Sequence, residues 1–188
     1  MKPHKLLGPM LMTAALLATA GAAGAADKGA VPESDAALAN SIRHEIVMYA
    51  DYTIWDDVNI QVANGNVHLT GAVAQPYRKD DIGRLARHVA GVNQVQNDIR
   101  VLPASFEDDR LRLRIARAIY SDPAMTRYAF QPLKPIHILV ENGRVTLAGV
   151  VSSEFDKQIA VMRASTTGLS FGPVTNHLQV VPEPASKS

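Results

Sequence analysis

Three arginines and two apolar residues share one side of a helix that the sequence predicts to begin at Asp108. Its inward side carries apolar residues at three- and four-residue spacings, namely Leu111, Ile115, Ala118 and Ile119. With that side buried, Leu113 and Tyr120 point almost opposite the core, seven residues apart. Arg110, Arg114 and Arg117 run beside them. An apolar strip flanked by arginines is typical of a helix that contacts an anionic membrane.

Two other interpretations of this strip remain open. In one, Leu113 and Tyr120 pack against the other half of the chain; in the other, the arginines form an ordinary solvated face. Under the lipid interpretation, Arg110, Arg114 and Arg117 bind lipid headgroups, and Leu113 and Tyr120 contact the membrane.

The other residue types that perform chemistry form no reactive constellation. Asp56 and Asp57 come nearest to a carboxylate pair, but neighbours at the start of a strand project in opposite directions, which favours a solvated loop. His68, His137 and His177 fall on outward strand phases, without the spacing of metal ligands. The sequence has no cysteine, no G-x-S-x-G motif and no phosphate-binding glycine loop. We therefore expect no catalysis, metal, cofactor or small-molecule substrate.

An internal repeat supplies the elements that position these residues. The segment Val58–Val73 (VNIQVANGNVHLTGAV) matches Ile136–Val151 (IHILVENGRVTLAGVV) at an offset of 136 − 58 = 78. Apolar and polar residues alternate on both sides of an Asn-Gly pair, which is Asn64-Gly65 or Asn142-Gly143. Because Asn-Gly provides the two positive φ values of a type I′ turn, each segment predicts a β-hairpin.

A glycine stands at the inward phase of the second strand in both hairpins. We expect Gly71 and Gly149 to let a helix approach the sheet closely, because an interior glycine is unfavourable in a strand unless packing requires it. Like the turn residues, these glycines are interpreted as structural.

Helical patterns flank each hairpin. Upstream, the buried stripe in the first copy is Leu38, Ile42, Ile46 and Tyr49, and we expect Asp35 and Asp108 to be the N-caps of the two upstream helices. Downstream, the expected buried stripes are Ile82, Leu85, Ala86 and Val89 in the first copy and Phe155, Ile159 and Met162 in the second.

A third strand closes each copy, Val95–Val101 in the first and Val174–Val180 in the second, and a helical return makes it parallel to the second strand. The fold class is α+β: two tandem α-β-β-α-β modules, at residues 35–103 and 108–182, each a three-stranded mixed sheet with two helices on one face. We expect the second strand to be central, although the sequence also allows the third strand beside the first.

The connection from the first helix to the hairpin differs between the modules. In the second module it runs from Asp122 to Pro135 and is about five residues longer, as the repeat offset changes from 73 at the helix to 78 at the hairpin. Its three prolines predict an ordered loop rather than a helix extension.

A few aromatic and polar residues have structural interpretations. Tyr52 and Trp55 predict a cover on the edge of the first module's core, in preference to a stacking platform for carbohydrates or bases. Asn97 and Asn176 recur on the inward phase of the third strand, where we expect them to bond nearby backbone.

The N-terminus predicts export. Basic residues precede the apolar run Met10–Ala18, and small residues after it offer cleavage sites near Ala25 or Ala26. We expect residues 1–26 to be a signal peptide and the mature protein to be periplasmic, either free or peripheral on a membrane.

Charge is distributed unevenly between the modules. Residues 35–103 hold 6 basic and 8 acidic residues, for a net −2, and residues 108–182 hold 9 and 6, for a net +3. An anionic partner should therefore prefer the second module. Export and a near-neutral total charge disfavour nucleic acid as a partner.

The chain resembles the BON domain family, named for bacterial osmotically induced and nodulation proteins, in tandem behind a signal peptide. The resemblance rests on N-G-x-V-x-L-x-G at Asn64–Gly71 and Asn142–Gly149, and on the closing segment Gly91–Ile99. The second copy departs from the pattern at Ser170 and Phe171, where Gly-Val is usual.

The resemblance implies a periplasmic, stress-associated envelope protein whose tandem modules bind phospholipid surfaces or assist other envelope proteins. We therefore expect an exported binding protein that contacts anionic phospholipid during envelope or osmotic stress. The alternative is a periplasmic chaperone or envelope-assembly adaptor that binds polypeptide through a sheet edge or an apolar patch.

Overall fold

A computed structural model describes residues 34–167 and 172–182 of the chain. The expected signal peptide, residues 1–26, and the atypical pair Ser170 and Phe171 lie outside the described residues.

The first module has the predicted element order and a single mixed sheet centred on its second strand. Strand β2 pairs antiparallel with β1 and parallel with β3 and β4, so the expected central position of the second strand is confirmed. The predicted third strand is split into two pieces that both pair with β2. The elements are α1 (Asp35–Met48), β1 (Asp57–Ala63), β2 (Asn66–Val73), α2 (Pro76–His88), β3 (Gln94–Asn97) and β4 (Arg100–Val101).

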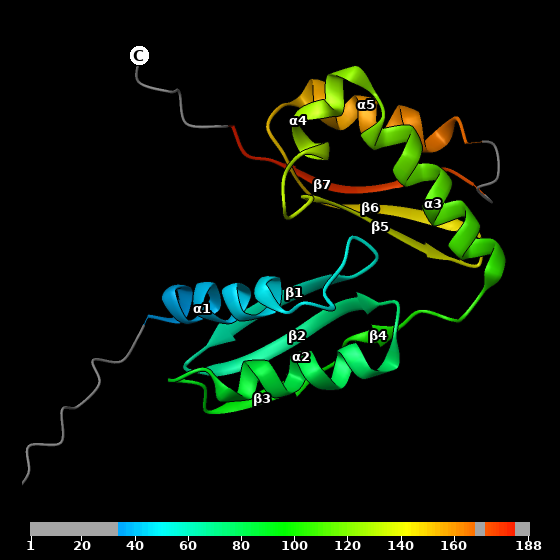
Figure 1. Ribbon diagram of the computed structural model, residues 1–188. Helices are drawn as coiled ribbons and strands as arrows, with labels where there is room; N and C mark the ends of the chain where they lie inside the picture. The colour runs from blue at the N-terminus through cyan, green and yellow to red at the C-terminus, as the bar shows by residue number, and fades with distance from the viewer. Residues whose placement is uncertain (1–33, 168–171, 183–188) are drawn as a thin grey trace, which may run out of the picture. The chain divides into compact units, whose positions relative to one another are not determined.

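The second module repeats this topology with an uninterrupted third strand. Strand β6 lies between β5, which is antiparallel to it, and β7, which is parallel. Figure 1 shows α3 and α5 together on one side of this sheet. The α+β fold of two tandem modules is thus confirmed. The elements are α3 (Phe106–Tyr120), η1 (Pro123–Met125), α4 (Thr126–Ala129), β5 (Ile136–Glu141), β6 (Arg144–Val151), α5 (Glu154–Ser165) and β7 (Thr175–Val180).

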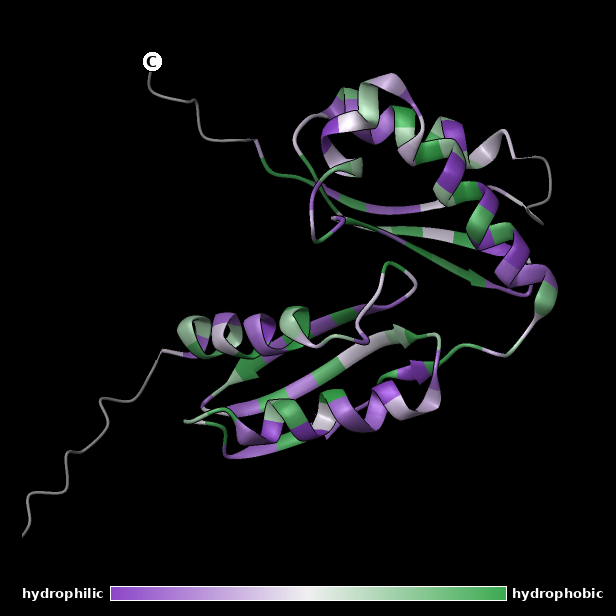
Figure 2. Cartoon of the chain, viewed as in Figure 1, coloured by the Kyte–Doolittle hydropathy of each residue, from purple (hydrophilic) through white to green (hydrophobic). Residues whose placement is uncertain are grey.

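Each module has its own apolar core between its helices and one face of its sheet. The first core joins Leu38, Ile42 and Ile46 of α1 to Val67 and Leu69 of β2, and Ile82 and Ala86 of α2 complete it. The second core joins α3, the hairpin and α5 in the same way. Apolar residues of the strands in both sheets are visible in Figure 2.

The predicted phase of α5 is wrong for two of its three apolar residues, whereas Ile159 is buried as expected. Phe155 and Met162, expected to be inward, are 66% and 50% exposed. The buried residues of this helix are Asp156, Ile159, Ala160 and Ala164. Relative to the predicted phase, α5 is rotated because the Asp156 side chain points inward and accepts hydrogen bonds. Phe155 and Met162 consequently lie on the outer face of the helix.

The helix caps also differ from the prediction, because Ser34 and Ser105 cap α1 and α3. The aspartates that follow bind the hairpin turns instead. The carboxylate of Asp35 accepts hydrogen bonds from the amides of Asn64 and Gly65 at 2.9 and 3.1 Å. In the second module Asp108 binds the Asn142 and Gly143 amides in the same manner, both at 2.8 Å. Each first helix therefore fixes its own hairpin turn, whose asparagine has the positive φ that a type I′ turn requires.

Gly71 and Gly149 serve a different purpose from the one expected. Both have a positive φ, +108° and +107°. A Cβ on Gly149 would lie 2.0 Å from the carbonyl oxygen of Pro135, and one on Gly71 would lie 2.2 Å from that of Asp57. The close neighbour is thus the backbone at the start of the first strand, and the helix is not involved.

The longer connection of the second module is ordered, as predicted, but contains short helical turns. Pro123 starts η1, and α4 follows directly. Within it, Met125 and Tyr128 are buried in the second core. The longer connection therefore contributes Met125 and Tyr128 to the second core before the chain enters β5.

Candidate functional site

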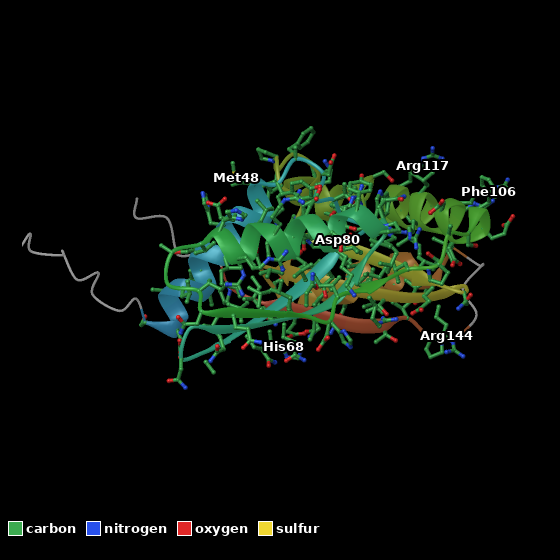
Figure 3. The ribbon with its side chains drawn as sticks, turned by 90° about the horizontal axis from the view of Figure 1, so that it is seen from below. Met48, His68, Asp80, Phe106, Arg117 and Arg144 are labelled. Atoms are coloured by element: carbon green, nitrogen blue, oxygen red, sulfur yellow. The ribbon has the colours of Figure 1, made fainter. Side chains whose placement is uncertain are left out.

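The outer face of α3, defined by Phe106, Arg110, Leu113, Arg114 and Arg117, carries exposed basic and apolar side chains together. Phe106 and Leu113 are 89% and 49% exposed, and the three arginines are exposed as well. Figure 3 shows Phe106 and Arg117 projecting from α3 away from the ribbon. The structure thus brings four of the five predicted site residues, with the exception of Tyr120, to one exposed face.

Tyr120 does not belong to this exposed face. Its hydroxyl donates a hydrogen bond to the carbonyl oxygen of Ile136 at 2.7 Å, and its ring packs against the second core. Burial accordingly raises the pKa of Tyr120. The expectation that Tyr120 points opposite the core is wrong, because at the end of the helix the backbone of β5 provides a partner for its hydroxyl.

Phe106 takes the place that the sequence interpretation assigned to Tyr120. It lies seven residues before Leu113 and therefore at nearly the same azimuth on the helix. It was missed because the helix was expected to begin at Asp108, whereas Ser105 is the N-cap and Phe106 the first helical residue. The spacing of Phe106 and Leu113 was the available signal.

The charge of the α3 outer face is only partly compensated. Arg110 lies 3.7 Å from Glu107, in a pair whose side chains are both largely exposed. Arg114 and Arg117 form no ion pair with a described residue. Arg112, by contrast, is buried: it donates to the carbonyl oxygen of Val140 at 2.6 Å and pairs with Asp109. The face is therefore electropositive, since exposed pairs contribute little and leave the guanidinium groups accessible.

A buried ion pair holds the connection before β1, where a solvated loop was expected. Asp56 is fully buried and lies 2.8 Å from Arg78, the third residue of α2. Its carboxylate also accepts hydrogen bonds from the Thr53 amide and hydroxyl, both at 2.9 Å, and from the Ala74 amide at 2.8 Å. The sequence pattern around Asp56 does not indicate this pair, because Arg78 is 22 residues away along the chain.

The second module contains an equivalent ion pair between its connection and its second helix, with the positions of acid and base exchanged. Its buried acid is Asp156, the third residue of α5, and its base is Arg127 in the connection, at 2.5 Å. Tyr128 donates a hydrogen bond to Asp156 at 2.9 Å, and Ser153 donates one at 2.7 Å. Burial acts to raise the pKa of Asp156, but the bonds from Arg127, Ser153 and Tyr128 outweigh it and lower the pKa. Asp156 is thus held as the carboxylate.

The aromatic residues of the first connection contact two different cores. Tyr52 packs against the first core, as predicted, whereas Trp55 packs against the second. Next to it, the carbonyl oxygen of Ile54 accepts a hydrogen bond from the Ile138 amide at 2.7 Å. The backbone oxygen of Asp56 lies 2.5 Å from Nδ1 of His137. The connection between α1 and β1 therefore binds β5 of the second module.

Three of the four remaining polar candidates have structural partners. His68 pairs with Asp98 at 2.8 Å on the outer sheet face, and His177 is exposed. Asn97 donates to the Lys79 carbonyl at 2.8 Å, and Asn176 accepts from the Leu178 amide at 3.0 Å, so both bind backbone as predicted.

Residues 34–167 and 172–182 offer neither a metal site nor a membrane-spanning helix. No three His, Asp or Glu side chains gather there in a way that could hold a metal ion. Within the same residues, no helix is both long enough and apolar enough to cross a membrane.

Comparison with known proteins identifies the repeated unit. The BON domain model matches residues 34–103 and again residues 108–182. No curated protein matches the chain. Two solved structures of CdsD, a structural protein of the type III secretion system of Chlamydia trachomatis, align at 16% identity with a TM-score of 0.28.

The first of these is of the C-terminal domain of CdsD. The alignments cover 76% and 75% of this chain but only 64% and 59% of the two CdsD chains. BON domains occur in envelope and periplasmic proteins and are generally non-enzymatic binding domains. Because the BON model accounts for both modules, the chain belongs to the BON domain family as a tandem member.

Proposed function

We propose that the protein is an envelope-associated binding protein that contacts anionic phospholipid surfaces with the outer face of α3. The observation that carries the proposal is the joint exposure of Phe106 and Leu113 among Arg110, Arg114 and Arg117. Such a face suits the boundary between headgroups and acyl chains, because apolar side chains enter the boundary while arginines meet phosphate. The net charge of +3 in the second module, against −2 in the first, favours the same surface.

The expected attraction is weak and reversible. Each arginine near an anionic surface contributes about 1 kcal/mol, so three arginines give roughly hundredfold enrichment over neutral lipid. A surface attraction is screened beyond a Debye length of about 8 Å at physiological salt, and binding should therefore weaken as salt is added. If Phe106 and Leu113 insert into the membrane boundary, part of the binding should persist at high salt; this part is the salt-resistant remainder.

Changing Arg110, Arg114 and Arg117 together to glutamate is expected to abolish flotation with phosphatidylglycerol-containing liposomes. All three side chains are exposed, so the circular dichroism spectrum should be unchanged. A matched control changes three other exposed arginines, Arg84, Arg87 and Arg144, to glutamate, with the same change in net charge. The control should still float with these liposomes. Equal flotation of the folded α3 variant and the parent would show that α3 is not the contact.

Single apolar changes are expected to separate insertion from charge attraction. Phe106→Asp or Leu113→Asp should remove the salt-resistant remainder and preserve most of the binding at low salt. Flotation across a salt series measures both parts. A salt series identical to that of the parent would mean that neither side chain enters the boundary.

A second candidate function is polypeptide binding, which the outer face of α5 favours. Phe155 and Met162 lie seven residues apart on α5, and both are at least half exposed. An exposed apolar pair of this kind is a feature of protein-binding surfaces. Suppression of the aggregation of an unfolded client, lost in Phe155→Asp and retained in the α3 triple variant, would support this function over lipid contact.

A further inference from the structure

An apolar groove lies beside the connection between α1 and β1. Its volume is about 600 Å³, within the range of about 300 to 1,000 Å³ for small-ligand sites. Apolar side chains form most of its lining, including Ile46, Trp55, Ile60, Leu133 and Val150. None of these residues belongs to the outer face of α3, so the groove is a separate feature of the molecule.

The long connection of the second module forms one wall of the groove. The groove is lined by Pro132, Leu133, Lys134 and Pro135. These residues end the connection that is longer in the second module than in the first. Leu133 is 54% exposed. Burying such a side chain under a ligand is favourable, because apolar surface leaves water without displacing a packed neighbour.

The charged groups at the groove are mainly basic. Arg43 and Lys134 line it, and the one acidic residue is Asp57. Arg43 donates a hydrogen bond to Asn40 at 3.2 Å, and the ammonium of Lys134 lies 5.9 Å from the Tyr120 ring centroid. Neither cation forms an ion pair with a described residue. Both therefore have charge available for an anion at the groove.

We propose that this groove binds the hydrocarbon chain of a single-chain anionic amphiphile, with Arg43 and Lys134 contacting its headgroup. An apolar lining with a few polar groups matches a ligand that has one polar end. An extended peptide fits less well, since each of its residues brings an N–H and a C=O that lose hydration when they have no partner. The groove would hold a single amphiphile molecule, whereas the outer face of α3 would contact the surface of a lipid bilayer. The two proposals are therefore independent of each other.

Trp55 makes the groove directly observable, because it is the sole tryptophan of the chain and lines the groove. The probe is 11-bromoundecanoate, kept below its micelle concentration, whose bromine quenches tryptophan fluorescence on contact. Quenching should saturate. Undecanoate should displace the probe, and 5-bromopentanoate should bind at least about tenfold more weakly, because each buried CH₂ contributes about 0.8 kcal/mol. The uncharged 11-bromoundecanol should also bind more weakly than the acid.

Variants locate the site. Leu133→Asp places a charge at an exposed position of the wall and should weaken binding at least about tenfold, since burial of a charge is unfavourable. Changing Arg43 and Lys134 to glutamate should weaken the acid at least about tenfold, at about 1 kcal/mol per basic residue, and leave the alcohol nearly unaffected. The triple arginine variant of α3 should bind the probe as the parent does, whatever it does with liposomes.

Three outcomes would overturn the proposal. One is quenching that does not saturate, and another is quenching that Leu133→Asp leaves unchanged. The third is displacement of the probe by an extended apolar peptide at a lower concentration than by undecanoate, which would assign the groove to polypeptide. Loss of liposome flotation without loss of quenching, or the reverse, would show which of the two lipid proposals fails.

Discussion

Replacing Asp56 by alanine is expected to destabilise the first module by about 3 to 5 kcal/mol, because it leaves the buried Arg78 without its counter-charge. Asp56 is fully buried, and the side chain of Arg78 is only 11% exposed. The same change removes the acceptor of the Thr53 and Ala74 amides. A typical mesophilic domain has only about 5 to 15 kcal/mol of stability, so a loss of this size is a large part of the total.

Urea unfolding followed by circular dichroism measures this loss, and hydrogen exchange can assign it to the first module. The neighbouring residue provides the control: Asp57 is half-buried and accepts one exposed hydrogen bond, from Asn59 at 3.2 Å. Asp57→Ala should change stability by less than about 1 kcal/mol. If both variants unfold at the same urea concentration, the pair with Arg78 does not stabilise the module.

Replacing Gly149 by alanine is expected to destabilise the second module by about 2 to 6 kcal/mol. Two costs add: a positive φ that a side chain rarely adopts, about 1 to 3 kcal/mol, and a clash with the Pro135 carbonyl oxygen, about 1 to 3 kcal/mol. The clash is with backbone at 2.0 Å, which a change of side-chain rotamer cannot relieve. Valine at this position should be at least as destabilising.

Gly172 separates the two costs. Its φ is +114°, similar to that of Gly149, but no heavy atom lies within 4 Å of a Cβ built there. Gly172→Ala should therefore show the conformational cost alone. Melting temperature and urea unfolding give the comparison, and equal losses at the two positions would mean that the carbonyl of Pro135 moves aside without cost.

The sheets were the most predictable part of the fold. Asn64-Gly65 and Asn142-Gly143 each determine a turn with two positive φ values, and the alternation around them fixes which side chains face the core. The third strand followed from the rule that a helical crossover returns parallel to its strand. The turns are a local constraint and the parallel return is a topological one, and both can be recognised from the sequence.

The phase of α5 was not predictable from apolar spacing alone. Phe155, Ile159 and Met162 fit a helical stripe as well as Ile159, Ala160 and Ala164 do, and the larger side chains favour the first set. The choice depends on Asp156, which turns inward to meet Arg127 and Tyr128. Those partners are more than 25 residues away along the chain, so the apolar spacing within the helix does not indicate which face is buried.

The candidate site on α3 was predictable in its arginines and in Leu113, because these depend only on the helical period. Its apolar end was assigned to Tyr120 and lies at Phe106. The difference arises at the helix ends, where the N-cap Ser105 adds a turn and the Ile136 carbonyl takes the tyrosine hydroxyl. The lining of the groove was beyond reach of the sequence, since it depends on how two connections meet.

The exchanged ion pairs bear on how two similar repeats avoid assembling incorrectly. Tandem modules risk trading equivalent elements during folding, which is a common route to misassembly in repeat proteins. If α5 took the place of α2, Asp156 would meet Asp56, and if α2 took the place of α5, Arg78 would meet Arg127. Each wrong arrangement would bring two like charges together, whereas each correct one pairs a buried aspartate with an arginine. The opposite polarity of the two ion pairs therefore favours the pairing of each connection with the helix of its own module.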